Sequence, residues 1–164
     1  MLPADPESPL EGAIHGWADG LPETGCYPFS FDSPNFDCLA DLERPTLRNV
    51  QIAAFADQIA AYRNDKEFRD ETAELKIASE SFIPLGQFAF NSHANPSSTA
   101  AFSGHILDQR TLVNTVHNRK FWSLRIRTYG GIMDIVADPE ILVGKPVDGG
   151  VVHGSFWLSG MLIE

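Results

Sequence analysis

The fold class of this chain is decided by the stretch FWSLRIRTYGGIMDIVA at residues 121–137. Apolar and polar side chains alternate along residues 121–129, which is the period of a strand with one buried face. The apolar face holds Trp122, Leu124 and Ile126. The dipeptide Gly130-Gly131 tolerates the two positive φ angles of a tight hairpin turn, and a second strand-like run follows at residues 132–137. The stretch therefore predicts two antiparallel strands joined by a hairpin.

Two more strand-like runs flank this hairpin, at residues 100–107 and 151–163. In the last run Gly154 and Gly160 alternate with large apolar side chains, and Gly104 repeats the pattern in the first. Glycines on an inward face suit strongly coiled strands in a small closed barrel. We expect its interior to hold Phe156 and Leu158 beside Trp122, Leu124 and Ile126. The predicted class is mainly β (α+β overall), an antiparallel barrel with one or two helices from the N-terminal half.

The length of 164 residues is typical of one domain, so we expect residues 1–164 to fold as a unit. Seven of the eleven prolines precede residue 46, which predicts that residues 1–99 form an irregular or helical segment wrapping the strands of residues 100–164. Within it, alternation predicts one short strand at a sheet edge. Its large side chains are Tyr27, Phe29 and Phe31.

Residues 46–62 fit one face of a helix, with Thr46 as its N-cap. The same residues also fit a strand over 49–55 followed by a shorter helix, so helix and strand both stay open over residues 47–60. The charged run at residues 63–76 has mixed signs, which predicts a solvated helix face or loop.

The formal charge of −10 lies wholly in residues 1–80, which hold 6 basic and 16 acidic side chains. An acidic chain gains nothing from neutralising phosphates or an anionic membrane, so both partners are disfavoured. The chain begins with neither a basic region nor an apolar one, and no apolar run approaches about 20 residues. We therefore expect a soluble cytoplasmic protein. In that compartment Cys26 and Cys38 are expected as reduced thiols, although a disulfide between them stays open.

The succession of strand-like runs resembles that of OB-fold-type small barrels. The resemblance rests on residues 102–107, a loop containing Asn114, and residues 121–128, 130–137 and 149–160. The C-terminal half is also similar to uncharacterised bacterial proteins. Membership of the OB type implies a barrel that binds oligonucleotides, oligosaccharides or other proteins on the outer face of its middle strands.

Motifs of the common catalytic and phosphate-binding types are absent from the sequence, including H-E-x-x-H, C-x-x-C and G-x-S-x-G. His105, Asp134 and His153 lie on predicted strands, and convergence of two imidazoles and a carboxylate would allow metal binding or acid–base chemistry. The alternative is that the histidines are hydrogen-bonded strand residues and the carboxylate lies on a wetted face. We expect no bound metal and no cofactor.

Basic and aromatic residues interleave only in residues 119–127, where Phe121, Arg125 and Arg127 project from one strand face. Single-strand nucleic-acid binders use this arrangement, but the arginines are instead expected to pair with carboxylates of residues 1–80. We interpret Trp17, Trp122 and Trp157 as core residues.

Taken together, these patterns favour a non-catalytic binding or interaction module for a protein or small ligand. A small enzyme using His105, Asp134 and His153, and a single-stranded nucleic-acid binder using Phe121, Arg125 and Arg127, are the alternatives.

Overall fold

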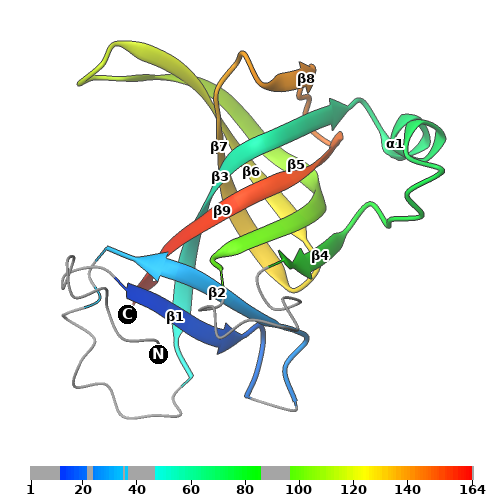
Figure 1. Ribbon diagram of the computed structural model, residues 1–164. Coiled ribbons are helices and arrows are strands. Elements are labelled where there is room, and N and C mark those ends of the chain that lie inside the picture. Colours follow the sequence, from blue (N-terminus) through cyan, green and yellow to red (C-terminus); the bar gives the residue numbers. More distant parts are fainter. Residues whose placement is uncertain (1–11, 22–23, 35, 37–46, 86–96, 164) are drawn as a thin grey trace.

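The computed structural model describes residues 12–21, 24–34, 36, 47–85 and 97–163. These residues form nine strands and one helix, so the predicted mainly β class is confirmed (Figure 1). In chain order they are β1 (Gly12–Trp17), β2 (Pro28–Ser33), β3 (Asn49–Tyr62), α1 (Asp65–Glu71), β4 (Ser81–Pro84), β5 (Thr99–Asn114), β6 (Arg119–Thr128), β7 (Gly131–Ala137), β8 (Leu142–Gly144) and β9 (Val151–Ile163). Cys38 lies outside the described residues, and Cys26 is an exposed free thiol.

Five strands close a ring of hydrogen bonds in the order β9-β3-β7-β6-β5, and β5 pairs back to β9. Four of these five pairings are antiparallel, but β3 runs parallel to β7. The short β8 is also parallel to β3. The sheet is therefore mixed, and the prediction of purely antiparallel pairing was wrong. The physical reason is that β3 and β7 are joined by a long connection through α1, β4, β5 and β6, which permits parallel neighbours.

Alternation along the strands sends one set of side chains into the ring, as predicted. Leu124, Ile126, Phe156 and Leu158 are buried, and Trp122 is partly buried against the same core. The rings of Phe102 and Phe156 stack there with centroids 3.9 Å apart. The core therefore lies between the inner faces of strands that the sequence pattern had sorted correctly.

Close backbone approach explains the glycine inside β5. A Cβ on Gly104 would lie 2.6 Å from the carbonyl oxygen of Arg127 on β6. The hairpin between β6 and β7 differs from the prediction, because Thr128 pairs with Gly131 and the two turn residues are Tyr129 and Gly130. Of the two glycines, Gly130 alone has a positive φ, 87°.

The prediction of a helix over residues 46–62 was wrong, because β3 is a strand from Asn49 to Tyr62. It is also longer than the strand over 49–55 that formed the alternative. β3 pairs with β9 along its whole length and with β7 and β8 on its other side. These two rows of backbone hydrogen bonds outweigh the helical preference of an alanine-rich segment.

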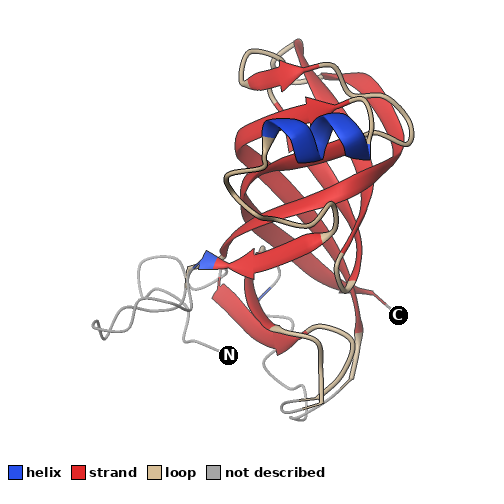
Figure 2. Cartoon of the chain, turned by 90° about the vertical axis from the view of Figure 1, so that its right-hand side faces the viewer, coloured by secondary structure: helices blue, strands red, loops and turns tan. Residues whose placement is uncertain are grey.

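The helix predicted as one alternative for residues 63–76 is α1, which lies across the outside of the strands (Figure 2). Asn64 caps its first turn by accepting a hydrogen bond from the Glu67 backbone at 3.0 Å. Most of its surface is solvated, as expected, but Phe68 is fully buried against Tyr62 and His153. A single apolar side chain therefore anchors this helix.

The described part of residues 1–99 contributes strands as well as a helix, where an irregular or helical segment was expected. The strand predicted around residues 27–31 is β2, but its position at a sheet edge was wrong because β2 lies between β1 and β9. No helix among the described residues is long and apolar enough to cross a membrane.

Candidate functional site

An exposed aromatic pair lies on the outer face of β3 and β9. Phe55 and Trp157 are register partners, and their ring centroids are 5.2 Å apart. Phe55 is 38% exposed and Trp157 is 44% exposed. The prediction that Trp157 is a core residue was therefore wrong. Side chains alternate along β9, so Trp157 lies on the face of the strand opposite to that of the buried Phe156 and Leu158.

A hydrogen bond fixes the indole of Trp157. Its Nε1 donates to Asp32 Oδ2 at 2.5 Å, and Ser98 Oγ donates to the other oxygen of the same carboxylate at 2.7 Å. The N–H of the indole is therefore hydrogen-bonded to β2, while part of the ring face is open to solvent. Fixing an aromatic side chain before binding lowers the entropy that a ligand must overcome.

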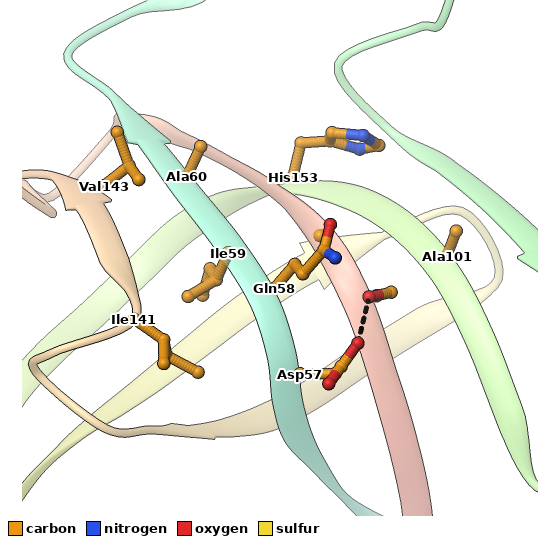
Figure 3. A pocket seen from close by; sticks show the side chains of 10 residues that line it. Asp57, Gln58, Ile59, Ala60, Ala101, Ile141, Val143 and His153 are labelled. Atoms are coloured by element: carbon orange, nitrogen blue, oxygen red, sulfur yellow. Dashed lines mark hydrogen bonds between the residues drawn. The ribbon is translucent and has the colours of Figure 1, made fainter.

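A hollow of about 580 Å³ opens beside this aromatic pair on the same strands. Its lining residues are Asp57, Gln58, Ile59, Ala60, Ala101, Ile141, Val143, His153, Gly154 and Ser155. In Figure 3, Asp57 and Gln58 project on the opposite side of β3 from Ile59 and Ile141. The hollow therefore has a polar flank and an apolar flank, the combination that orients a small ligand.

A β-bulge positions the polar flank. The register of β3 and β9 shifts between Ala56 and Gln58, so Asp57 is an extra residue without a partner in β9. Its Oδ2 accepts a hydrogen bond from Ser155 Oγ at 3.4 Å. Bulges redirect side chains out of the regular pleat. Here the bulge gives the outer face two consecutive polar side chains, Asp57 and Gln58.

The same outer face carries three carboxylates that form no ion pair within the described residues. Asp32 and Asp57 accept the hydrogen bonds given above, and Asp134 accepts one from Gln51 Nε2 at 3.4 Å. No lysine or arginine of the described chain forms an ion pair with any of the three. The face is therefore rich in hydrogen-bond acceptors and repels anions.

His105 lies in a second polar cluster, between β5, α1 and the start of β4. Its Nδ1 is 2.8 Å from Glu80 Oε1, and its Nε2 is 3.2 Å from both carboxylate oxygens of Asp65. Arg127 Nε donates to the same oxygen of Glu80 at 2.9 Å. The hydrogen bond from Arg127 lowers the pKa of Glu80, and His105 contributes to this shift. The pKa of Asp65 is lowered by a hydrogen bond from Ser79 and then by His105.

His153 lies on the outer face of β9 beneath α1, where its ring centroid is 6.5 Å from that of Phe68. Burial lowers the pKa of this imidazole, and a hydrogen bond with the backbone of Phe102 acts in the opposite direction. A neutral imidazole in this position packs as a partly apolar wall of the hollow.

The structure does not bring Asp134 to the two histidines, although His105 and His153 lie on the paired strands β5 and β9. His105 contacts Glu80 and Asp65, whereas Asp134 lies on β7 in register with Arg125 and contacts Gln51. Within the ranges that the structure describes, no group of three or more His, Cys, Asp or Glu side chains is arranged to hold a metal ion.

The three residues of the predicted binding segment share the outer face of β6. Phe121 is half-buried, and Arg125 and Arg127 are exposed. Arg127 forms an ion pair with Glu80. Glu80 belongs to residues 1–80, so this is the kind of pairing that the excess of acid in that segment predicted. Arg125 forms no ion pair with any described residue, so within the described residues the expected pairing is found for Arg127.

Comparison of the chain with protein-family models, with curated proteins and with solved structures finds no match.

Proposed function

We propose that this protein is a non-catalytic binding module that takes a neutral, polyhydroxylated ligand, such as an oligosaccharide, on the outer face of β3 and β9. The observation that carries the proposal is the exposed pair of Phe55 and Trp157 beside the hollow that contains Asp57 and Ser155. This use of an outer sheet face is the one that the resemblance to OB-type barrels implies.

Aromatic rings and acceptors match the two surfaces of a sugar. The open faces of Phe55 and Trp157 offer area for the apolar C–H face of a pyranose ring. Asp57, Gln58 and Ser155 offer acceptors and donors for hydroxyl groups at the edge of the same ring. Both kinds of group project from adjacent strands, so one ligand can contact them together.

Charge favours a neutral ligand over a phosphate-bearing one. Three carboxylates on this face form no ion pair with a described residue, although Arg125 is the register partner of Asp134, and the whole chain has a formal charge of −10. A nucleic-acid backbone gains affinity by contacting Lys and Arg and loses it beside Asp and Glu. The nucleic-acid alternative therefore depends on Arg125, which lies on β6 rather than on the aromatic face.

The test is calorimetric titration of the full chain with neutral oligosaccharides, acidic oligosaccharides and single-stranded oligonucleotides. We expect binding of a neutral oligosaccharide that Phe55→Ala and Asp57→Asn each weaken by about tenfold or more, the loss of one good contact. Tyr129→Ala, which removes an exposed aromatic side chain from the β6–β7 turn, is the matched control and should leave the affinity unchanged.

Two results would overturn the proposal. One is the same loss of affinity in the Tyr129→Ala control as in Phe55→Ala. The other is selective binding of oligonucleotides that Arg125→Glu abolishes and Phe55→Ala leaves intact, which would assign the binding function to β6.

A further inference from the structure

The hairpin of β5 and β6 extends beyond the ring as a two-stranded arm, residues 109–121 (Figure 1). β9 accompanies β5 only as far as the pair His105–Val151, and β7 accompanies β6 only from the pair Trp122–Ala137. Within the arm, therefore, each strand has the other as its single described neighbour. An isolated two-stranded hairpin is at best marginally stable in water, so a third element is expected to cover it.

The arm presents apolar side chains to solvent. Every residue from 110 to 120 is exposed, and among them Val116 at the tip is 81% exposed. Leu112 and Val113 on β5 are also exposed. Leu112 and Val113 are consecutive in β5, so they lie on opposite faces of the arm. Exposed apolar side chains on a projecting element mark an interaction surface.

The tip of the arm has a defined shape. Asn114 Oδ1 accepts hydrogen bonds from the backbone of Val116 at 2.9 Å and of His117 at 3.2 Å, and Asn118 takes a positive φ of 52° to complete the turn. A turn that is already ordered loses little entropy when a partner binds it.

The charge of the arm is opposite to that of its own root. Residues 109–121 contain Arg110, Arg119 and Lys120 and no Asp or Glu, and neither Arg119 nor Lys120 forms an ion pair with a described residue. The root is flanked by residues 138–150, whose charged side chains are Asp138, Glu140, Lys145 and Asp148. Three negative charges and one positive charge give this segment a net charge of −2. The hydrogen bond from Gly149 N to Ile106 O, 2.9 Å, places it at the root.

We infer that two copies of this chain pair through their arms, side by side and antiparallel about a twofold axis, so that the basic tip of each meets the acidic root of the other. A twofold arrangement makes each contact twice and closes the assembly at a dimer. Each arm would then cover one apolar face of the other, and opposite charges would face each other at both ends. Nucleic acid fits the arm less well, because the tip exposes Val116 and the chain as a whole is strongly acidic.

The experiment is sedimentation equilibrium of the full chain with two charge-reversal variants. The tip variant is Arg119→Glu/Lys120→Glu, and the root variant is Glu140→Lys/Asp148→Lys. All four side chains are exposed, so both variants are expected to fold, and circular dichroism verifies this. The control is Arg48→Glu/Lys76→Glu, which reverses two exposed charges away from the arm.

We expect a native dimer whose dissociation constant rises by about tenfold or more in each reversal variant, because like charges then face each other at both ends. Mixing the tip variant with the root variant should restore a dimer, because the opposite charges meet again in the mixed pair. The control should dimerise like the native chain.

Any of three results would overturn the inference. The first is a native chain that stays monomeric at about 200 µM, which is far above the dissociation constant of a specific dimer. The others are reversal variants that dimerise like the native chain, and a mixture of the two variants that remains monomeric. Oligonucleotide binding by a monomeric native chain, lost in the tip variant, would assign the arm to nucleic acid instead.

Discussion

The imidazole of His105 is hydrogen-bonded to Glu80, a residue 25 positions earlier in the chain, with 2.8 Å between Nδ1 and Oε1. The other ring nitrogen lies 3.2 Å from Asp65 at the start of α1. The two ring nitrogens therefore contact carboxylates from two different segments of the chain. His105 therefore fastens α1 and the segment before β4 to the outer face of β5.

This arrangement predicts that His105→Ala lowers the free energy of unfolding by about 1 kcal/mol, because two contacts with carboxylates are lost at a partly exposed position. Urea unfolding measures the change. His117→Ala, in the exposed turn between β5 and β6, is the control and should have no measurable effect. Equal unfolding curves for the two variants would show that the cluster does not stabilise the fold.

His153 predicts a loss of stability on mild acidification. Its pKa in the folded protein lies below the ordinary value of 6.5, so the unfolded chain takes up the proton first as the pH falls. The contribution of His153 is complete above pH 6.5 and is lost as the pH falls through that value towards the folded pKa. Thermal melting at a series of pH values should therefore show a declining midpoint below about pH 6.5.

The variant His153→Phe keeps an aromatic ring beside Phe68 and removes the titrating group. We expect this variant to show a smaller decline below about pH 6.5, because burial also lowers the pKa of His15, which still contributes. His117→Phe should retain the full decline. An unchanged profile in His153→Phe would assign the dependence to another group.

We expect an added side chain at Gly104 to clash with β6, and Gly131 offers a matched position for comparison. Because an added Cβ would lie 2.6 Å from the Arg127 carbonyl oxygen, Gly104→Ala should destabilise the protein by about 2 kcal/mol, as overpacking between two backbones requires a shift of the strands. At Gly131 no atom lies within 4 Å of the added Cβ, so Gly131→Ala should be close to neutral. Equal denaturation midpoints for the two variants would contradict the close approach of β5 and β6.

Phe68 is the buried apolar side chain of α1, so we expect it to supply most of the apolar contact between the helix and the strands. It is fully buried beneath the helix, so Phe68→Ala should lower the free energy of unfolding by about 3 kcal/mol, through lost burial and a residual cavity. Limited proteolysis should then cut near residues 65–76 before the rest of the described chain. Leu75→Ala, in an exposed position after the helix, is the control. Protection of this segment in Phe68→Ala would show that the polar contact between His105 and Asp65 is sufficient to hold the helix.

Local alternation predicted four of the five strands that follow residue 98. It missed the short β8 and ended the first run at residue 107, whereas β5 continues to Asn114. The run at residues 151–163 coincides with β9, and the inward positions Leu124, Ile126, Phe156 and Leu158 are all buried. Each of these side chains follows the period of two that the pleat imposes, so its face can be read from its immediate neighbours. The mainly β class and the position of the core followed from this pattern.

The candidate site was less predictable, because it depends on which strands become neighbours. The prediction placed Trp157 in the core. The alternation along β9 indicates instead that its side chain lies on the outer face, and this pattern was available in the sequence. Nothing in the sequence near Phe55 showed that β3 would pair with β9, so the aromatic pair could not be anticipated. The extra residue at Asp57 is likewise a property of the register between two strands.

The sequence by itself determined the alternation that buries one face of each late strand, the excess of acid in residues 1–80 and the basic character of the β5–β6 hairpin. Tertiary structure decided that residues 49–62 form a strand, because hydrogen bonds to β9, β7 and β8 on both edges outweigh a weak local preference for helix. It also decided that His105 meets Glu80 and Asp65 rather than Asp134. Contacts between residues far apart in the chain depend on strand order and register, and neither is encoded in the neighbouring residues.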